Sequence, residues 1–144
     1  MKFAEFHAGQ VIEAGPYTIT EQQILDFATD WDPQWFHTDP EAAAQGPHGG
    51  LIASGWQTCG IAMRLLAEKA LAGSESFASP GLQYVKWLKP VRPNDTLRVV
   101  ATVVETRRAS AKPMGILRWR WQLYNQDGAE VLDLEATSLF RLAD

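Results

Sequence analysis

One apolar segment decides the fold of this chain: residues 54–72, with the sequence SGWQTCGIAMRLLAEKALA. Its apolar residues recur around most of a helical circumference, which is typical of a buried helix. Gly73 follows at the position where a glycine commonly ends a helix. Ser54 and Gln57 have the spacing of a capping box, so we expect the Ser54 side chain to cap the first turn. At 1.5 Å per residue, such a helix would be about 28 Å long.

The residues after this helix change from a helical to a strand-like period. Apolar and polar residues alternate, which predicts strands with one buried face. The candidate strands are residues 82–88, 97–104, 117–124 and 132–142. Strands of this kind need a cover, and the buried helix provides one. We therefore predict an α+β fold, a single domain over residues 1–144 in which a long antiparallel sheet wraps around the central helix.

A further helix is predicted before the central one. Thr20 and Gln23 form a capping box at its start. Pro33 ends it, because the residue before a proline is disfavoured in helical geometry. Asp32 should therefore lie just beyond the helix in a non-helical conformation. The helical spacing also places Trp31 on the apolar face, where we expect it to pack into the protein.

Composition narrows the class of protein. The chain has 144 residues, of which 46% are hydrophobic and 21% charged, with a net charge of −4. This balance does not favour nucleic-acid binding through a general positive field. The single cysteine, Cys59, excludes an internal disulfide and a multi-cysteine zinc site, and it is expected to be a small buried hydrophobe. No signal-peptide pattern or spanning stretch is visible, so we expect a cytoplasmic protein with no membrane partner.

The residues that can carry chemistry gather just before the central helix. Residues 30–39 read DWDPQWFHTD, three carboxylates and a histidine among aromatic side chains. Burying acids beside a histidine costs free energy unless they pair or take part in chemistry. Asp30 is expected to be exposed, and Asp39 to cap the next helix. From the residues alone, Asp32 and His37 could be structural, the first ending a helix and the second tying down a loop.

Three sequence elements resemble the MaoC-like dehydratase family, which has the hot-dog fold and includes the (R)-specific enoyl-CoA hydratases. The family signature Asp-x-Asn-Pro-x-His-x-Asp resembles residues 32–39, DPQWFHTD, where the spacing from Asp to His and to the second Asp is kept. The family element Ile-Ala-His-Gly resembles residues 52–55, IASG. The family turn Pro-Val-x-x-Gly-Asp resembles residues 90–95, PVRPND. The resemblance extends from about Ile19 onward.

The resemblance implies an enzyme, a hydratase or dehydratase that adds or removes water at the 2,3 double bond of an acyl-CoA-type thioester. Asp32 and His37 would form an acid/base pair that holds one water. The backbone amide of Gly55 would polarise the thioester carbonyl. A glycine at this position is equally compatible with close packing of helix on sheet. No metal or redox cofactor is implied, and coenzyme A enters as part of the substrate.

The chain departs from the family pattern at three positions: Gln34 replaces Asn, Trp35 replaces Pro and Ser54 replaces His. All three are expected at the substrate site, with Trp35 narrowing the pocket. His48 stands among glycines and is expected to be exposed. Neither it nor the other histidines has the spacing of a zinc site. The candidates for contacts to coenzyme A phosphates are Lys86, Lys89, Arg92, Arg107, Arg108 and Lys112.

The expected partners are the thioester substrate and a second copy of the chain, in a homodimer or a higher oligomer of dimers. Two other functions are compatible with the fold. One is an acyl-CoA thioesterase, which would usually place its acid on the central helix, where Glu68 is the only carboxylate. The other is a non-catalytic protein that binds acyl thioesters.

Overall fold

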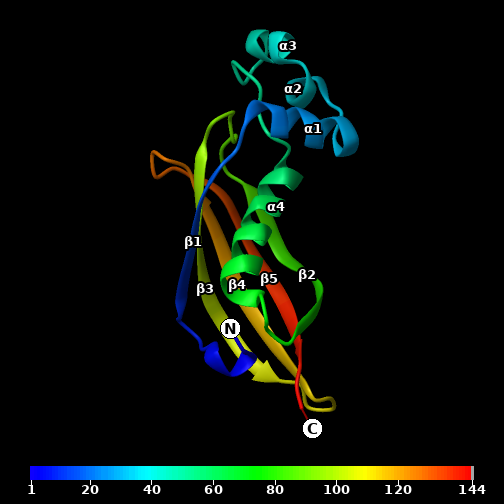
Figure 1. Cartoon of the computed structure of the whole chain (residues 1–144), viewed down its shortest axis with the longest axis vertical. Coiled ribbons are helices and arrows are strands. Elements are labelled where there is room, and N and C mark those ends of the chain that lie inside the picture. The colour runs from blue at the N-terminus through cyan, green and yellow to red at the C-terminus, as the bar shows by residue number, and fades with distance from the viewer. Residues whose placement is uncertain (144) are drawn as a thin grey trace.

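A five-stranded antiparallel sheet and one long helix make up most of the computed structural model, which describes residues 1–143 (Figure 1). The strand order is β1-β3-β4-β5-β2. The strands are β1 (Val11–Thr18), β2 (Ser76–Trp87), β3 (Thr96–Arg108), β4 (Met114–Tyr124) and β5 (Glu130–Arg141). The helices are η1 (Phe3–Glu5), α1 (Glu21–Trp31), α2 (Trp35–Thr38), α3 (Pro40–Gln45), α4 (Gly55–Leu66) and η2 (Ala67–Leu71). This is the predicted α+β hot-dog fold.

Helix α4 lies along the sheet, while α1, α2 and α3 gather beyond one end of it, next to the start of α4 (Figure 1). The predicted helix over residues 54–72 is present, but its last turn, η2, is π-helical. α4 packs on β1 and β3 through a face that includes Ile61, Leu65 and Leu66. Its other face is open, and Trp56 there is 61% exposed. The helix is therefore less completely buried than its composition predicts.

The two faces of the sheet follow the predicted alternation. On β4, the buried residues Leu117, Trp119, Trp121 and Leu123 alternate with partly exposed polar and aliphatic ones. The indole of Trp119 donates a hydrogen bond to Ser138 Oγ at 3.1 Å, which satisfies its polar atom within the core.

Charged side chains pair across neighbouring strands on the other face. Arg120 donates to both carboxylate oxygens of Asp133, and the hydroxyl of Tyr84 donates to the same carboxylate. The bonds from Arg120, more than any other contact, lower the pKa of Asp133. Arg118 pairs with Glu135 at 2.9 Å. These pairs keep the charges of the outer face satisfied without placing any in the core.

Strand β2 is longer than predicted, because it begins at Ser76 rather than at residue 82. Its first half contains Ser79, Pro80 and Gly81, which are poor strand formers, and its pairing with β5 is interrupted by register shifts. A proline is tolerated here because β2 is an edge strand with no partner on its other side within the described chain.

The structure corrects the placement of Trp31. Its side chain is 75% exposed, whereas Ile24 and Ala28 on the same helix are buried. The helix ends at Trp31, beyond the part of α1 that lies against the core, so helical spacing there no longer indicates burial. None of the helices within residues 1–143 combines the length and apolar character needed to cross a membrane.

The packing of α4 yields a stability prediction. Leu66, the last residue of α4, is fully buried. Leu66→Ala should therefore lower the free energy of unfolding by about 2–5 kcal/mol, because buried apolar surface is lost and a cavity is left behind. Lys69, one turn later, is exposed, and Lys69→Ala should change it by less than about 0.5 kcal/mol. Urea denaturation measures both. Similar losses in the two variants would contradict the packing described.

Candidate active site

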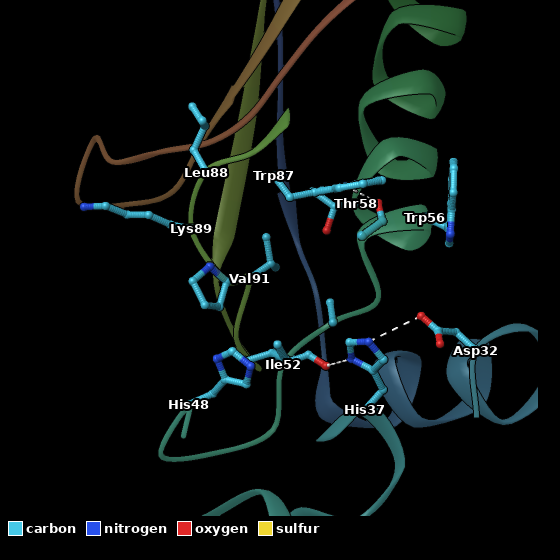
Figure 2. Close-up of a pocket in the computed structure, with 13 residues that line it drawn as sticks. Asp32, His37, His48, Ile52, Trp56, Thr58, Trp87, Leu88, Lys89 and Val91 are labelled. Carbon is cyan, nitrogen blue, oxygen red and sulfur yellow. Dashed lines mark hydrogen bonds and ion pairs between the residues drawn. The ribbon is translucent and has the colours of Figure 1, made fainter. Parts of the chain in front are cut away.

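A pocket of about 420 Å³ opens at the start of α4 (Figure 2). It is built from the turn after α1, the short helix α2, the loop before α4, the first turn of α4 and the segment after β2. Its lining residues are Asp32, His37, His48, Ile52, Ala53, Gly55, Trp56, Thr58, Trp87, Leu88, Lys89, Pro90 and Val91. Most of the wall is apolar, with a few polar side chains among the lining residues, as is common in small-molecule sites.

Local capping sets the position of Asp32. Thr20 and Gln23 form the predicted reciprocal capping box at the start of α1. The helix ends at Trp31, and Asp32 takes a non-helical conformation with φ −154° and ψ 65°. Its N–H still donates to Ala28 O at 2.9 Å. The carboxylate is thereby carried at the end of a rigid helix, as Pro33 predicts.

His37 is buried and fixed from the other side. It lies in the single turn of α2, and its Nδ1 is 2.7 Å from Ile52 O. A carbonyl oxygen only accepts hydrogen bonds, so Nδ1 carries the hydrogen. Nε2 therefore faces Asp32 Oδ2, at 3.3 Å. A neutral imidazole would direct a lone pair at the carboxylate, so only a proton or a donor such as water can bridge the two groups.

The Asp32 carboxylate is held by two donors. Gln34 Nε2 donates to Oδ1 at 2.7 Å, and Ser54 Oγ donates to Oδ2 at 2.7 Å. The pKa of Asp32 is lowered, chiefly by the Gln34 bond, with further contributions from Ser54 and His37 that together outweigh the opposing effect of burial. The side chain is 17% exposed, so it is reachable from the pocket. Asp32 is therefore an ionised acceptor at neutral pH.

Ser54 and Gln34 are predicted to lie at the substrate site, but in the structure their side chains bond Asp32. The Ser54 side chain does not cap α4 with Gln57 as expected. A bond to a carboxylate is stronger than a bond to a neutral amide, which explains why the hydroxyl turns to Asp32. Neither residue lines the pocket. Both bond the Asp32 carboxylate instead.

Trp35 does not narrow the pocket, contrary to expectation. It is not among the lining residues and is 47% exposed. Its ring packs over Gly46, where an added Cβ would lie 2.6 Å from it, and stands edge-on to Phe36. Trp35 therefore shapes the junction of α2 and α3 outside the pocket.

Gly55 lies in the pocket wall beside an aromatic residue that sequence analysis missed. Trp87 Nε1 donates to Gly55 O at 2.8 Å, and an added Cβ on Gly55 would be 2.5 Å from the indole. Figure 2 shows the Trp87 ring reaching from the end of β2 to the first turn of α4. The packing interpretation of this glycine is thus correct, and it leaves the predicted role of its amide open. Trp87 gave only a strand signal in the sequence.

The remaining acids and histidines occupy distinct places. Asp30 is exposed, and Asp39 caps α3 by accepting from Ala42 N at 3.1 Å, both as predicted. His48 is exposed as predicted but also lines the pocket, and its carbonyl accepts from Arg92 Nη2 at 2.7 Å. Of the basic residues proposed for phosphate contacts, Lys89 lines the pocket. No group of three or more potential metal ligands occurs within residues 1–143.

Cys59 is only partly buried, and its side chain packs against the hydrophobic core. Burial raises the pKa of its thiol, so the thiol stays protonated at neutral pH. This agrees with the small hydrophobe predicted for it.

Comparisons with known proteins agree with this fold. The chain is 33% identical over 141 residues to the uncharacterized protein YdeM of Bacillus subtilis, covering 98% of this chain and 99% of that one. It is 35% identical over 89 residues to 3-hydroxyacyl-thioester dehydratase Z of Mycobacterium tuberculosis, which covers 60% of this chain and 59% of that protein.

A solved structure agrees along nearly the whole chain. The crystal structure of a MaoC-like dehydratase from Rhodospirillum rubrum superposes with a TM-score of 0.89 at 30% identity, covering 98% of this chain and 97% of that one. Residues 3–117 match the family described as the MaoC like domain. The chain therefore belongs to the MaoC-like domain family.

Proposed function

We propose that this protein is a hydratase or dehydratase that adds or removes water at the 2,3 double bond of an acyl-CoA-type thioester. The observation that carries the proposal is the Asp32–His37 pair in the pocket at the start of α4, with Oδ2 and Nε2 3.3 Å apart. The likeness to a 3-hydroxyacyl-thioester dehydratase supports the same reaction class.

In this mechanism one water molecule contacts both groups from the side of the pocket. In the hydration direction, Asp32 accepts a proton from this water while its oxygen bonds to C3 of the substrate. His37, protonated on Nε2, delivers a proton to C2 as the carbon–carbon π bond breaks. The proton gained by Asp32 then returns to His37 across the 3.3 Å contact. The sum is one water added, with neither residue changed, and dehydration is the reverse.

Negative charge develops on the thioester oxygen during this reaction. The start of α4 suits its stabilisation, because the first amides of a helix lack intrahelical partners and carry a partial positive charge. The Ser54 side chain leaves these amides unoccupied, since it bonds Asp32. We therefore assign the Gly55 N–H to the thioester carbonyl. We further propose that coenzyme A is part of the substrate and that Lys89, which lines the pocket, contacts its anionic groups.

The alternative thioesterase function has less support. Its acid would come from the central helix, but Glu68 lies in η2, far along the helix from the pocket. Glu68 is exposed and pairs with Arg64 at 3.1 Å. The second alternative, a non-catalytic protein that binds acyl thioesters, predicts binding of the substrate without turnover.

Two substitutions test the acid/base pair. Asp32→Asn removes the base and His37→Ala removes the proton donor, so each should lower the rate of hydration by a factor of about 10²–10⁴. The assay follows loss of the conjugated double bond in a series of enoyl-CoA substrates. Asp30→Asn, which removes an exposed acid two residues away, is the control and should keep full activity.

The products of this assay separate the alternatives. Hydroxyacyl-CoA supports the proposal, free thiol indicates a thioesterase, and binding without turnover indicates a binding protein. Full activity in both Asp32→Asn and His37→Ala would show that the assigned mechanism is wrong.

We also propose that the protein is a homodimer joined through β2. Edge strands are usually blunted by charge or covered, because their free backbone groups template further pairing. β2 is twelve residues long, and it exposes Phe77, Leu82 and Trp87, with Lys86 as its one charged residue. Pairing of the part of β2 after Pro80 with β2 of a second copy would cover this edge. The higher oligomer of dimers stays a prediction.

A charge placed on this edge should separate the copies. Leu82 is 44% exposed, and Leu82→Lys should shift the protein from dimer to monomer in sedimentation velocity, because pairing would bury the new charge. Val104 on the interior strand β3 is 42% exposed, so Val104→Lys is a matched control that should stay dimeric. A monomeric wild-type protein at micromolar concentration would refute the interface.

A further inference from the structure

We propose that Ser54 and Gln34 are positioning residues for Asp32: together they fix the orientation of its carboxylate and hold it in the ionised form. Ser54 does so in place of capping α4. The catalytic consequence of this inference rests on the proposed hydratase function, whereas the effect on Asp32 itself does not.

The two donors reach the carboxylate from different parts of the chain. Gln34 is two residues away in the turn before α2, and Ser54 is twenty-two residues away at the start of α4. Each donates to a different oxygen, at 2.7 Å in both cases. The terminal torsion of an aspartate is otherwise soft. With one donor on each oxygen the carboxylate plane is set, and Oδ2 is held 3.3 Å from His37 Nε2.

The Ser54 hydroxyl bonds Asp32 although Ser54 stands where a helix cap is expected. The residue is fully buried and directly precedes the first residue of α4, with φ −57° and ψ 138°; this is the usual place and residue type for a cap. Its carbonyl takes part in the helix by accepting from Thr58 N at 3.1 Å, but its hydroxyl does not cap. One side chain thus ties the candidate base to the element that carries the Gly55 amide. Because Gly55 follows Ser54 in the chain, this bond restrains the spacing between the carboxylate and the Gly55 amide.

Three other titratable residues line the pocket with Asp32. His37 faces it from α2, and its field favours the carboxylate form. His48 and Lys89 are the other titratable groups lining the pocket. Hydrogen bonds donated to a carboxylate favour its charged form. Removal of either donor should therefore raise the Asp32 pKa, whatever reaction the pocket catalyses.

The first experiment measures the ionisation of Asp32 directly, by NMR titration of its side-chain carboxyl carbon in the full chain. Ser54→Ala and Gln34→Ala should each raise the pKa relative to wild type. The conservative variants Ser54→Thr and Gln34→Asn keep a donor and should restore it toward the wild-type value. An unchanged pKa in both alanine variants would overturn the inference.

A second experiment uses stability and needs no activity. A lowered carboxyl pKa stabilises the folded state above the pKa of the unfolded chain, and this contribution is lost as pH falls through the folded-state pKa. The difference in free energy of unfolding between pH 7 and acid pH should shrink in Ser54→Ala. It should shrink in Asp32→Asn as well, and adding Ser54→Ala to Asp32→Asn should not change it further. Equal effects of Ser54→Ala in both backgrounds would mean that Ser54 acts independently of Asp32.

A third experiment measures how the rate of enoyl-CoA hydration depends on pH. Ser54→Ala and Gln34→Ala should lower kcat about tenfold, the equivalent of one hydrogen bond to a charged group, with little change in KM. The acid limb of the profile should move to higher pH, because the base is protonated at a higher pH. A uniform loss of rate with an unmoved limb would indicate a merely structural role.

The outcomes keep the two proposals apart. If the wild-type protein hydrates no enoyl thioester but the Asp32 pKa responds to Ser54→Ala, the hydratase function fails and the positioning role stands. If hydration depends on Asp32 and His37 but the pKa does not respond to either alanine variant, the positioning role fails alone.

Discussion

The packing of α4 on the inner face of the sheet is the constraint on which the rest of the molecule depends. Ile61, Leu65 and Leu66 bury one face of the helix against β1 and β3, so its start is held at one end of the sheet. The pocket forms there, lined by the first turn of α4, the end of β2, the turn after α1 and helix α2 (Figure 2). A helix free to slide would leave the amide of Gly55 and the carboxylate of Asp32 without a defined spacing.

The site adds a second, polar constraint to this apolar one. His37 is anchored by Ile52 O, and Asp32 by Gln34 and Ser54, so both members of the pair are fixed by groups other than each other. Their own contact, at 3.3 Å, is longer than a charge-assisted hydrogen bond between such groups. Second contacts of this kind preorganise a site, because the reactive atoms need not be reoriented when substrate binds.

The sequence-based predictions succeeded where local chemistry and periodicity decide structure. Capping at Thr20 and Asp39, the end of α1 before Pro33 and the alternation along β4 are set by residues within a few positions of one another. They failed where a side chain had a choice of partners. Ser54 had a nearby amide to cap, but a charged acceptor twenty-two residues away binds it more strongly. Trp31 and Trp35 have apolar rings, yet they lie where the chain leaves the core.

By itself, the sequence determined the α+β class, the central helix, the four strands that follow it and the proximity of Asp32 to His37, because these follow from periodicity and short spacing. Only the tertiary structure decided what surrounds that pair. Trp87 comes to Gly55 across thirty-two residues, and Ser54 comes to Asp32 across twenty-two. Contacts of this kind depend on how the helix and the sheet edge meet in space, and on competition between partners that no local pattern records.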